Sequence, residues 1–317
     1  MSNNFDWAPK PWTKAPATPV WTQYFKQANP TPVFQKDDLR ACTAPGKIWG
    51  ATFDDGPSPA THGLLDYFRT INMHTTFYTV GSVAIKYPEV LLQTYQAGHE
   101  IGVHTWSHPL LTKLSDDEIV AELIYSAKTI YQLTGQAPKY IRPPFGGSDD
   151  RVRRIANSMG LTVVGFVDTE DWKHWDSKAK MQPVVTGHFK EWIKNGVTGL
   201  ITLQHDVWAA EVEVGKEAMD LLVKAGYTVK PVYECLGAVL EGFFKSGQFE
   251  EKWNVVAPYV EKVVTVTPNN GTSGNLNMKP VPAKVVVSAP VETTVRSGAL
   301  LISLPSLFAV VVGYLIL

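Results

Sequence analysis

Carboxylates and histidines at short spacings are the residues of this 317-residue chain best suited to chemistry. Asp54 and Asp55 adjoin each other in Thr-Phe-Asp-Asp-Gly-Pro, and His104 and His108 lie four residues apart in His-Thr-Trp-Ser-His. Two histidines at this spacing on a turn or short helix can present their nitrogens to one ion. Adjacent residues that leave a strand point in different directions, so one carboxylate can bind the ion while the other faces a water molecule. Two histidines and one aspartate leave a coordination position open, which is the layout of a catalytic metal centre.

Three more polar clusters follow β-rich runs. They are Arg-Pro-Pro-Phe-Gly from Arg142, Asp-Thr-Glu-Asp-Trp from Asp168 and Leu-Gln-His-Asp from Leu203. Arg142 is suited to orient a catalytic carboxylate through a bidentate pair, and a structural salt bridge is the alternative. His205, with an acid to hold its tautomer, is a natural general acid. The alternative for His205 is a histidine with a purely structural hydrogen bond.

These clusters need a scaffold that brings strand ends together. Short β-rich runs alternate with helical stretches, the clearest of which is 115–134, where Ser115 and Glu118 match a capping box. About seven parallel strands with right-handed helical crossovers predict an α/β fold, a distorted (β/α) barrel in a single catalytic domain. An open doubly wound sheet is the alternative, but no Gly-rich nucleotide fingerprint follows the first strand. The predicted strands are 48–53, 75–80, 100–103, 140–142, 162–167, 199–203 and 228–232.

All five clusters fall at the carboxyl ends of predicted strands, the face where barrels build active sites. Lys plus Arg (29) nearly balances Asp plus Glu (30), so the composition argues against nucleic-acid binding. Cys42 and Cys235 flank the predicted barrel, and we expect one disulfide to tie its ends together. Two separate buried thiols are the alternative. The bridge is favoured because the tail of the chain points to an oxidising compartment.

The end of the sequence predicts a lipid anchor. Residues 300–317 are almost wholly apolar, and small residues and a polar spacer precede them, as in a glycosylphosphatidylinositol (GPI) attachment signal. Ser288 and Ser297 are the two candidate attachment residues, and a true C-terminal membrane helix is the alternative. An anchored protein is secreted, and Asn270 stands in a glycosylation sequon. No signal peptide is visible over residues 1–16, so we expect that the natural start has been trimmed.

Composition shifts divide the chain into four predicted segments. Residues 1–37 are expected to form an extended arm, and 38–250 the catalytic domain. Residues 251–298 are predicted to be a linker or stalk, and 299–317 the hydrophobic anchor signal. The protein is therefore expected at the cell surface, on the plasma membrane and in the cell wall.

The five clusters, in this order and spacing, resemble the five motifs of the polysaccharide deacetylase family, also called the NodB homology domain. The Thr-Phe-Asp-Asp-Gly-Pro and His-Thr-x-x-His strings are the most specific of them, and the resemblance covers roughly 46–240. It implies a metal-dependent hydrolase that removes N-acetyl groups from chitin or its oligomers, similar to GPI-anchored fungal chitin deacetylases. No protein partner is implied.

The resemblance also implies roles at individual positions. Asp54 would be the general base, and Asp55, His104 and His108 would hold one divalent ion. Zn²⁺ is expected, with Co²⁺ or Mn²⁺ as alternatives. Such an ion lowers the pKa of a bound water toward about 7.

Three further residues receive roles from the same resemblance. Arg142 would orient the base, and the Phe145 backbone N–H would help to bind an oxyanion. His205, supported by Asp171, would protonate the leaving amine. Family members often carry Tyr at the position of Phe145, and fungal chitin deacetylases often carry an acidic residue where this chain has Gly147. The second difference bears on the preferred substrate length rather than on the chemistry.

Four tryptophans lie in or beside these motifs, and flat aromatic faces suit sugar rings. Trp175 and Trp208 are the better candidates for sugar contacts, whereas Trp106 and Trp172 are expected to serve partly as wall and partly as platform. Chitin is the predicted substrate, and acetyl-xylan is the first rival. A catalytically lapsed chitin-binding protein and a structural wall protein are rivals from other classes. Both are disfavoured because every predicted metal ligand and catalytic acid is present.

Overall fold

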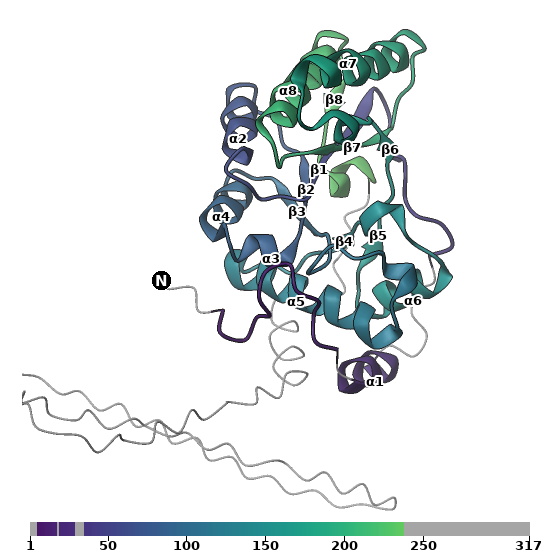
Figure 1. Cartoon of the computed structure of the whole chain (residues 1–317). Helices are drawn as coiled ribbons and strands as arrows, with labels where there is room; N and C mark the ends of the chain where they lie inside the picture. The colour runs from purple at the N-terminus through teal and green to yellow at the C-terminus, as the bar shows by residue number, and fades with distance from the viewer. Residues whose placement is uncertain (1–4, 18, 29–34, 238–317) are drawn as a thin grey trace, which may run out of the picture. The chain divides into compact units, whose positions relative to one another are not determined.

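Parallel strands form the centre of the structure (Figure 1). The computed structural model describes residues 5–17, 19–28 and 35–237. The strands within them are β1 (Ile48–Asp54), β2 (Thr76–Thr79), β3 (Glu100–Val103), β4 (Tyr140–Ile141), β5 (Thr162–Val163), β6 (Val167–Asp168), β7 (Ile201–His205) and β8 (Thr228–Val229). Their order is β5-β4-β3-β2-β1-β7-β6, with β8 beside β1, and every paired neighbour is parallel. No pairing joins β5 to β6 in the described part of the chain, so the curled sheet stays open there.

The longer helices lie around the outside of the strands (Figure 1), whereas residues of the short helix α9 join the interior cluster. The α-helices are α1 (Pro19–Ala28), α2 (Thr61–Thr70), α3 (Gly81–Ala84), α4 (Pro88–Gln96), α5 (Asp116–Thr134), α6 (Asp150–Ser158), α7 (Lys178–Lys194), α8 (Ala209–Lys224) and α9 (Val232–Cys235). Three 3₁₀ turns are η1 (Leu111–Lys113), η2 (Pro144–Gly146) and η3 (Asp171–His174). This arrangement confirms the predicted distorted (β/α) barrel. The predicted helix also begins as expected, because Ser115 and Glu118 form a capping box at the start of α5.

β1 shows how alternation along a strand builds two cores. Trp49, Ala51 and Phe53 join the main cluster between the sheet and its helices. Ile48 belongs to a smaller cluster inside the barrel, with Tyr78 and other residues of neighbouring strands. Successive side chains of a strand point to opposite faces, so the even positions of β1 face the interior. Asp54, the last of them, therefore ends at the carboxyl mouth of the barrel.

The amino end of the barrel is closed by α9 and a disulfide. Cys42 and Cys235 are bonded, 193 residues apart in sequence, which confirms the predicted bridge. Gly50 lies beside it, and a Cβ at this position would come within 3.0 Å of the Cys235 Sγ atom. Glycine in β1 therefore lets the bridge pack directly against the strand.

The predicted strand 162–167 is wrong in one respect, because it consists of two short strands that pair with different neighbours. β5 pairs with β4, and β6 pairs with β7. Between them the carbonyl groups of Val164 and Gly165 accept hydrogen bonds from the Arg142 side chain at 3.5 and 3.0 Å. A buried guanidinium thus takes acceptors that a continuous ladder would have used.

The N-terminal arm is partly helical rather than extended throughout. Pro19 is the first residue of α1, a position that tolerates its missing N–H, and Trp21 and Phe25 are buried one turn apart. Before the helix, Trp7 stacks on Tyr125 of α5 with 5.9 Å between ring centroids. The arm is therefore bound to the barrel through aromatic contacts with α5.

Within the described ranges, no helix has the length and apolar character needed to cross a bilayer. The predicted linker, the hydrophobic anchor signal and the candidate modification residues Asn270, Ser288 and Ser297 all lie outside the described residues.

Candidate active site

Strand register brings the sequence clusters to one level of the barrel. Asp54 of β1 is the direct partner of His205 in β7. On the other side of β1, Thr79 of β2 pairs with Val103 of β3, and Val103 pairs with Ile141 of β4. The residues that follow these partners include His104 and Arg142, at the same mouth of the barrel. Parallel strands in register therefore explain how clusters far apart in sequence meet in space.

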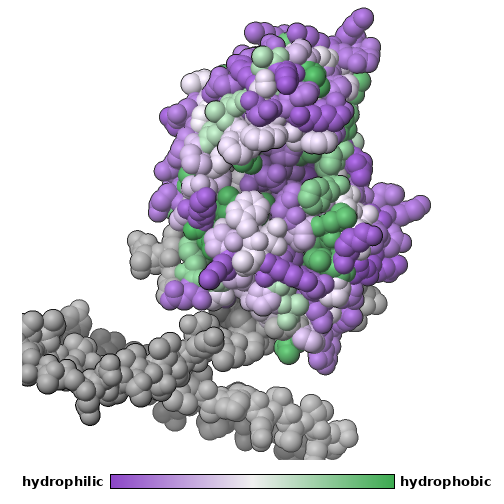
Figure 2. All heavy atoms as spheres, viewed as in Figure 1, coloured by the Kyte–Doolittle hydropathy of each residue, from purple (hydrophilic) through white to green (hydrophobic). Residues whose placement is uncertain are grey.

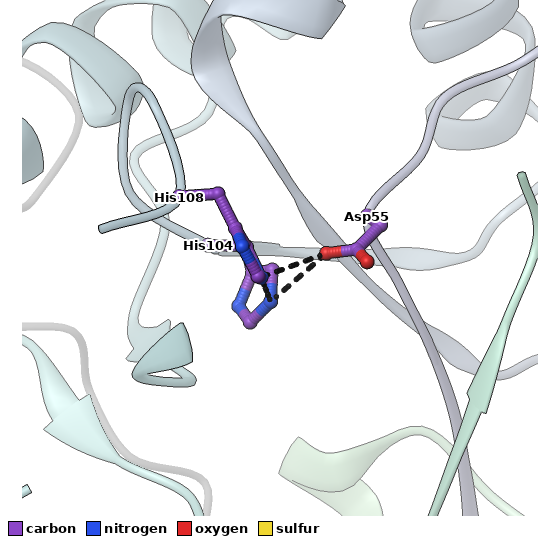
Figure 3. A group of neighbouring side chains, drawn as sticks. All are labelled: Asp55, His104 and His108. Atoms are coloured by element: carbon purple, nitrogen blue, oxygen red, sulfur yellow. Dashed lines mark hydrogen bonds and ion pairs between the residues drawn. The ribbon is translucent and has the colours of Figure 1, made fainter. Parts of the chain in front are cut away.

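Asp55, His104 and His108 point toward one another (Figure 3). The Asp55 Oδ1 atom lies 3.2 Å from His104 Nε2 and 3.1 Å from His108 Nε2, and the two Nε2 atoms are 3.2 Å apart. Asp55, Thr105 and His108 all have positive φ angles, of 72°, 64° and 59°. Such left-handed backbone is uncommon for residues other than glycine and clusters at functional sites.

The donor set of these three residues fits a divalent cation. His104 Nδ1 lies 2.6 Å from the Arg142 carbonyl oxygen, which can only accept, so Nδ1 carries the proton and Nε2 offers its lone pair. Asp55 Oδ1 is buried, and no described residue gives it a hydrogen bond of good geometry. The Asp55 carboxylate oxygen and the Nε2 atoms of His104 and His108 lie 3.1–3.2 Å apart, close enough to bind one cation together. One carboxylate oxygen and two imidazole nitrogens are ligands that zinc and related ions accept.

The electrostatics of Asp55 agree with this assignment. Burial tends to raise the pKa of its carboxyl group, but the adjacent His104 and His108 outweigh burial and hold the pKa well below its usual value. Asp55 is therefore ionised, as a metal ligand must be.

Asp54 forms a buried ion pair with Arg142. The Arg142 Nη1 atom lies 2.8 Å from Asp54 Oδ1, and both side chains are almost completely buried. The guanidinium also donates to the Thr52 hydroxyl and stacks over the Tyr78 ring, 4.2 Å from its centroid. Because its donors and its face are occupied, the guanidinium is fixed in place. Asp54 Oδ2 is left pointing toward the metal ligands, 3.9 Å from His104 Nε2.

His205 is held by Asp171 from η3. The His205 Nδ1 atom lies 2.8 Å from Asp171 Oδ1, and the His205 backbone N–H donates to Asp171 Oδ2 at 2.7 Å. Burial tends to lower the pKa of His205, but the charge and hydrogen bond of Asp171 outweigh burial and raise the pKa well above its usual value. His205 Nε2 lies 3.9 Å from Asp55 Oδ2, so it faces the site from the side of β7.

Phe145, in the turn η2, stands beside His108 of the candidate metal site. Its φ of 59° is unfavourable for a bulky residue, and its side chain is 72% exposed. The Phe145 ring meets His108 edge to face, with 4.8 Å between centroids. The strained turn places the exposed Phe145 ring against His108, where it forms part of the rim.

The four tryptophans have different environments. Trp172, Trp175 and Trp208 are each about half exposed, and the rings of Trp175 and Trp208 lie 5.0 Å apart at 32°. Trp106 is fully buried and packs against Tyr125 of α5, 5.7 Å away. The prediction that Trp106 takes part in a sugar platform is therefore wrong, because its ring belongs to the core.

One cavity connects these tryptophans with the polar residues. It encloses about 950 Å³ and reaches Asp55 and His205, and its lining includes Trp172, Trp175 and Trp208. Figure 2 shows a hydrophilic recess in the middle of the face drawn in Figure 1, with pale surface on both sides. The cavity thus combines two polar residues of the candidate site with exposed aromatic rings, a common form of ligand site.

Two buried acids that sequence reasoning missed hold the site's loops. Glu122 of α5 accepts hydrogen bonds from the N–H groups of Trp106 and Ser107 at 2.9 and 2.8 Å, and from the Ser107 hydroxyl. Glu211 of α8 likewise accepts from the N–H groups of Val207 and Trp208. A charged residue on the buried face of an otherwise apolar helix was the available signal for Glu122.

Comparison with known proteins gives a consistent result. The sequence profile of the family "Polysaccharide deacetylase" matches residues 41–164. Chitin deacetylase 1 of Cryptococcus neoformans var. grubii is 35% identical over 268 residues, which are 78% of this chain and 54% of that protein. The chain thus spans about half the length of this curated relative.

Solved structures match over most of their own length. The chitin deacetylase of the fungal pathogen Colletotrichum lindemuthianum superposes with a TM-score of 0.61 at 27% identity, covering 67% of this chain and 96% of that one. The peptidoglycan deacetylase PdaC of Bacillus subtilis superposes with a TM-score of 0.54 at 30% identity, covering 66% and 95%. Sequence profile, relatives and fold agree, and the chain belongs to the polysaccharide deacetylase family.

Proposed function

We propose that this chain is a metal-dependent N-deacetylase that converts chitin or its oligomers to chitosan and acetate. One observation carries the proposal. A proton acceptor, Asp54, and a proton donor, His205, lie on two sides of the Asp55–His104–His108 cluster. Asp54 Oδ2 is 3.9 Å from His104 Nε2, and His205 Nε2 is 3.9 Å from Asp55 Oδ2. Amide hydrolysis needs a base for water and an acid for the leaving nitrogen, on either side of the reacting carbon.

Asp54 is suited to act as the base. Arg142 holds Oδ1 and leaves Oδ2 directed at the site, so the carboxylate is oriented before substrate arrives. A water oxygen attacks the acetyl carbonyl carbon, and the water's proton passes to Asp54 Oδ2. A divalent ion held by Asp55, His104 and His108 would act as a Lewis acid that stabilises the developing negative charge. The Phe145 N–H is proposed as a further donor to this oxyanion.

His205 is suited to act as the acid. Its raised pKa keeps Nε2 protonated near neutral pH, and Asp171 fixes the ring. When the C–N bond breaks, the Nε2 proton passes to the nitrogen, which leaves as the free amine, and acetate is the other product. The base thus acts on the attacking water, and the acid acts on the leaving nitrogen.

Zinc is the proposed ion, with Co²⁺ and Mn²⁺ as alternatives. Two imidazoles and one carboxylate with an open position form a common catalytic zinc layout, although the same ligands bind other first-row metals. A chelation and reconstitution series with each metal distinguishes them.

The substrate assignment is supported by the relatives and by the aromatic cleft. The fungal proteins similar to this chain are named chitin deacetylases, and the exposed faces of Trp175 and Trp208 suit sugar rings. We propose a secreted protein of the cell surface, in keeping with the disulfide. The GPI anchor stays a proposal that rests on the sequence pattern of the tail. Acetyl-xylan and a lapsed binding protein are the alternatives.

The test is acetate release from chitin hexamer by the 317-residue chain, before and after chelation and with Zn²⁺ restored. We expect release that chelation abolishes and metal restores. Asp54→Asn is expected to lower kcat by about 10²–10⁴-fold, because the base is lost while the fold is kept. Asp66→Asn is the matched control, since Asp66 is exposed and pairs only locally with Arg69. No release by the fully metal-loaded chain rules out chitin, and acetylated xylan is then assayed before a binding role is accepted.

A further inference from the structure

An exposed tryptophan of the N-terminal arm stands in a strained conformation. Trp12 has a φ of 60°, and its side chain is 59% exposed. It is the third residue of a tight turn, in which Thr13 donates to the Lys10 carbonyl through both its N–H, at 3.1 Å, and its hydroxyl, at 2.6 Å. Left-handed backbone at a non-glycine residue costs on the order of 1–3 kcal/mol and persists only where the surroundings impose it.

Hydrogen bonds connect this turn to the loop 104–108, which carries His104 and His108 and is called the metal-ligand loop below. The Trp12 N–H donates to the Ser82 hydroxyl of α3 at 3.2 Å. The N–H groups of Gly81 and Ser82 in turn donate to the carbonyls of Thr105 and Trp106, at 2.9 and 3.1 Å. Trp12 is therefore two hydrogen bonds away from the backbone that follows His104.

A second link fixes the arm to the same loop. The Ala15 N–H donates to one carboxylate oxygen of Glu122 at 3.1 Å. The other oxygen of Glu122 accepts from Trp106 and Ser107 of the metal-ligand loop. Trp12 thus has a defined position relative to the reaction centre, although it belongs to the arm and not to the barrel.

The cavity that reaches Asp55 and His205 also reaches Trp12. Lys86 and Tyr87 line it on the side of α3 and the arm, whereas Trp175 and Trp208 line it on the side of α7 and α8. In Figure 1 the arm runs beside α3, across the strands from α7 and α8. The cavity's volume of about 950 Å³ is near the upper limit of pockets for drug-sized ligands, about 1,000 Å³. One N-acetylated sugar does not fill it.

We propose that Trp12 forms a distal sugar subsite, so that the cleft grips an oligosaccharide on both sides of the reacting unit. The inference rests on the proposed function, because the polysaccharide is taken as the occupant of the cleft. The exposed indole offers a flat face to a sugar ring, and the bound turn positions it without loss of backbone freedom on binding. Trp12 consequently makes long oligomers better substrates than short ones.

The experiment compares the 317-residue wild-type chain with Trp12→Ala and Trp12→Phe on N-acetylglucosamine oligomers of two to six units. We expect Trp12→Ala to lower kcat/KM about tenfold for the longest oligomers, mainly through KM, and to leave the shortest unchanged. Trp12→Phe is expected to restore most of the loss, because it keeps a flat ring. Tyr233→Ala is the matched control, since this exposed aromatic residue does not line the cleft.

Two results overturn the subsite. An equal loss for every oligomer length means that Trp12 acts only through the metal-ligand loop, and no loss at any length means that its ring meets no substrate. Calorimetric binding of the same oligomers in the Asp54→Asn background separates this proposal from the proposed function. Length-dependent binding that Trp12→Ala weakens supports the subsite even if the wild-type chain releases no acetate. Acetate release with unaltered length dependence supports the activity and rejects the subsite.

Discussion

The two ends of the barrel strands carry opposite kinds of structure. At the carboxyl ends, buried charges meet on strained backbone, and Asp54 and Arg142 pair there with almost no exposure to solvent. Seven non-glycine residues in the described part of the chain have positive φ, and five of them lie in loops at this end: Asp55, Thr105, His108, Phe145 and Glu170. This end gives up local stability for the placement of functional groups.

The amino ends are closed by apolar packing and a covalent bond. The interior beside β1 is filled by side chains of α9 and the residue after it, namely Val232, Cys235 and Leu236. The Cys42–Cys235 bridge links the segment before β1 to α9. The comparison teaches a separation of roles: changes at the carboxyl end should alter catalysis with little loss of stability, and changes at the amino end should do the reverse.

The largest expected effect is at the carboxyl end, in Asp171→Asn. An amide cannot accept from both the N–H and the ring Nδ1–H of His205, so the imidazole loses its orientation and its raised proton affinity. We expect kcat to fall by about 10²–10⁴-fold. Because the acid must be protonated, and its pKa falls without Asp171, the residual activity should also be lost at a lower pH than in the wild type.

The measurement is a pH–rate profile with thermal unfolding on the same samples. Asp176→Asn is the control, because Asp176 is exposed and lies in the same loop. An unfolding midpoint lowered in proportion to the loss of activity contradicts the separation of roles. A basic limb of the profile that does not move contradicts the role of Asp171.

The second prediction concerns the amino end, where Cys42→Ser with Cys235→Ser removes the bridge. Its 193-residue separation closes a long loop, so we expect the free energy of unfolding to fall by about 2–5 kcal/mol. Denaturant unfolding without reductant measures this change. At a temperature where the variant stays folded, kcat should equal that of the wild type. A tenfold lower kcat under those conditions means that strain at one end is transmitted to the other.

Sequence periodicity was sufficient for the order of elements and for the barrel. Helical stretches such as 115–134 and β-rich runs alternate clearly, and the loops between them are short. The break between β5 and β6 was not readable from 162–167, because it depends on hydrogen bonds from Arg142, some twenty residues earlier. Local pattern therefore predicts which elements form, whereas a distant buried charge decides where one strand stops.

The polar groups of the site were predictable because each follows a strand. The supporting groups were not, because their positions depend on packing between elements. Glu122 looks like an ordinary helix residue until α5 docks against the metal-ligand loop. Trp106 looks like a sugar platform until Tyr125 of the same helix covers it. Environment, rather than residue type, separates a supporting residue from one that meets substrate.

Glu122→Gln should give the third largest effect and tests how the carboxyl end is supported. A glutamine keeps one acceptor oxygen. Its amide N–H₂ therefore opposes either the Ala15 N–H or the N–H groups of Trp106 and Ser107, depending on which oxygen it replaces. We expect metal affinity to fall about 10–100-fold, which is the usual effect of replacing a residue that supports metal ligands from outside. Competition with a chelator measures it. Asp117→Asn on the same helix is the control, and equal metal affinity in Glu122→Gln and wild type contradicts the supporting role.

The smallest effect is expected from a half-buried acid at the amino end. Glu100, the first residue of β3, accepts from the Thr76 hydroxyl at 2.6 Å and from the Tyr233 N–H at 3.2 Å. Burial raises the pKa of Glu100 to about 7, against an ordinary value of 4.5. The folded state then holds the proton more tightly than the unfolded state. The stabilisation of the protonated form is therefore fully present below pH 4.5 and is lost as the pH rises to about 7.

Glu100→Gln should remove this pH dependence. Between pH 5 and pH 8 the stability difference between wild type and variant is expected to change by about 1–2 kcal/mol, with the wild type losing stability as the pH rises. This is less than the full pKa shift implies, because the residue is partly exposed. Unfolding in urea across this range measures it, with acetate release as the control for the other end. A difference that stays constant with pH shows that Glu100 is ionised throughout, and that the amino end tolerates a half-buried charge at this position.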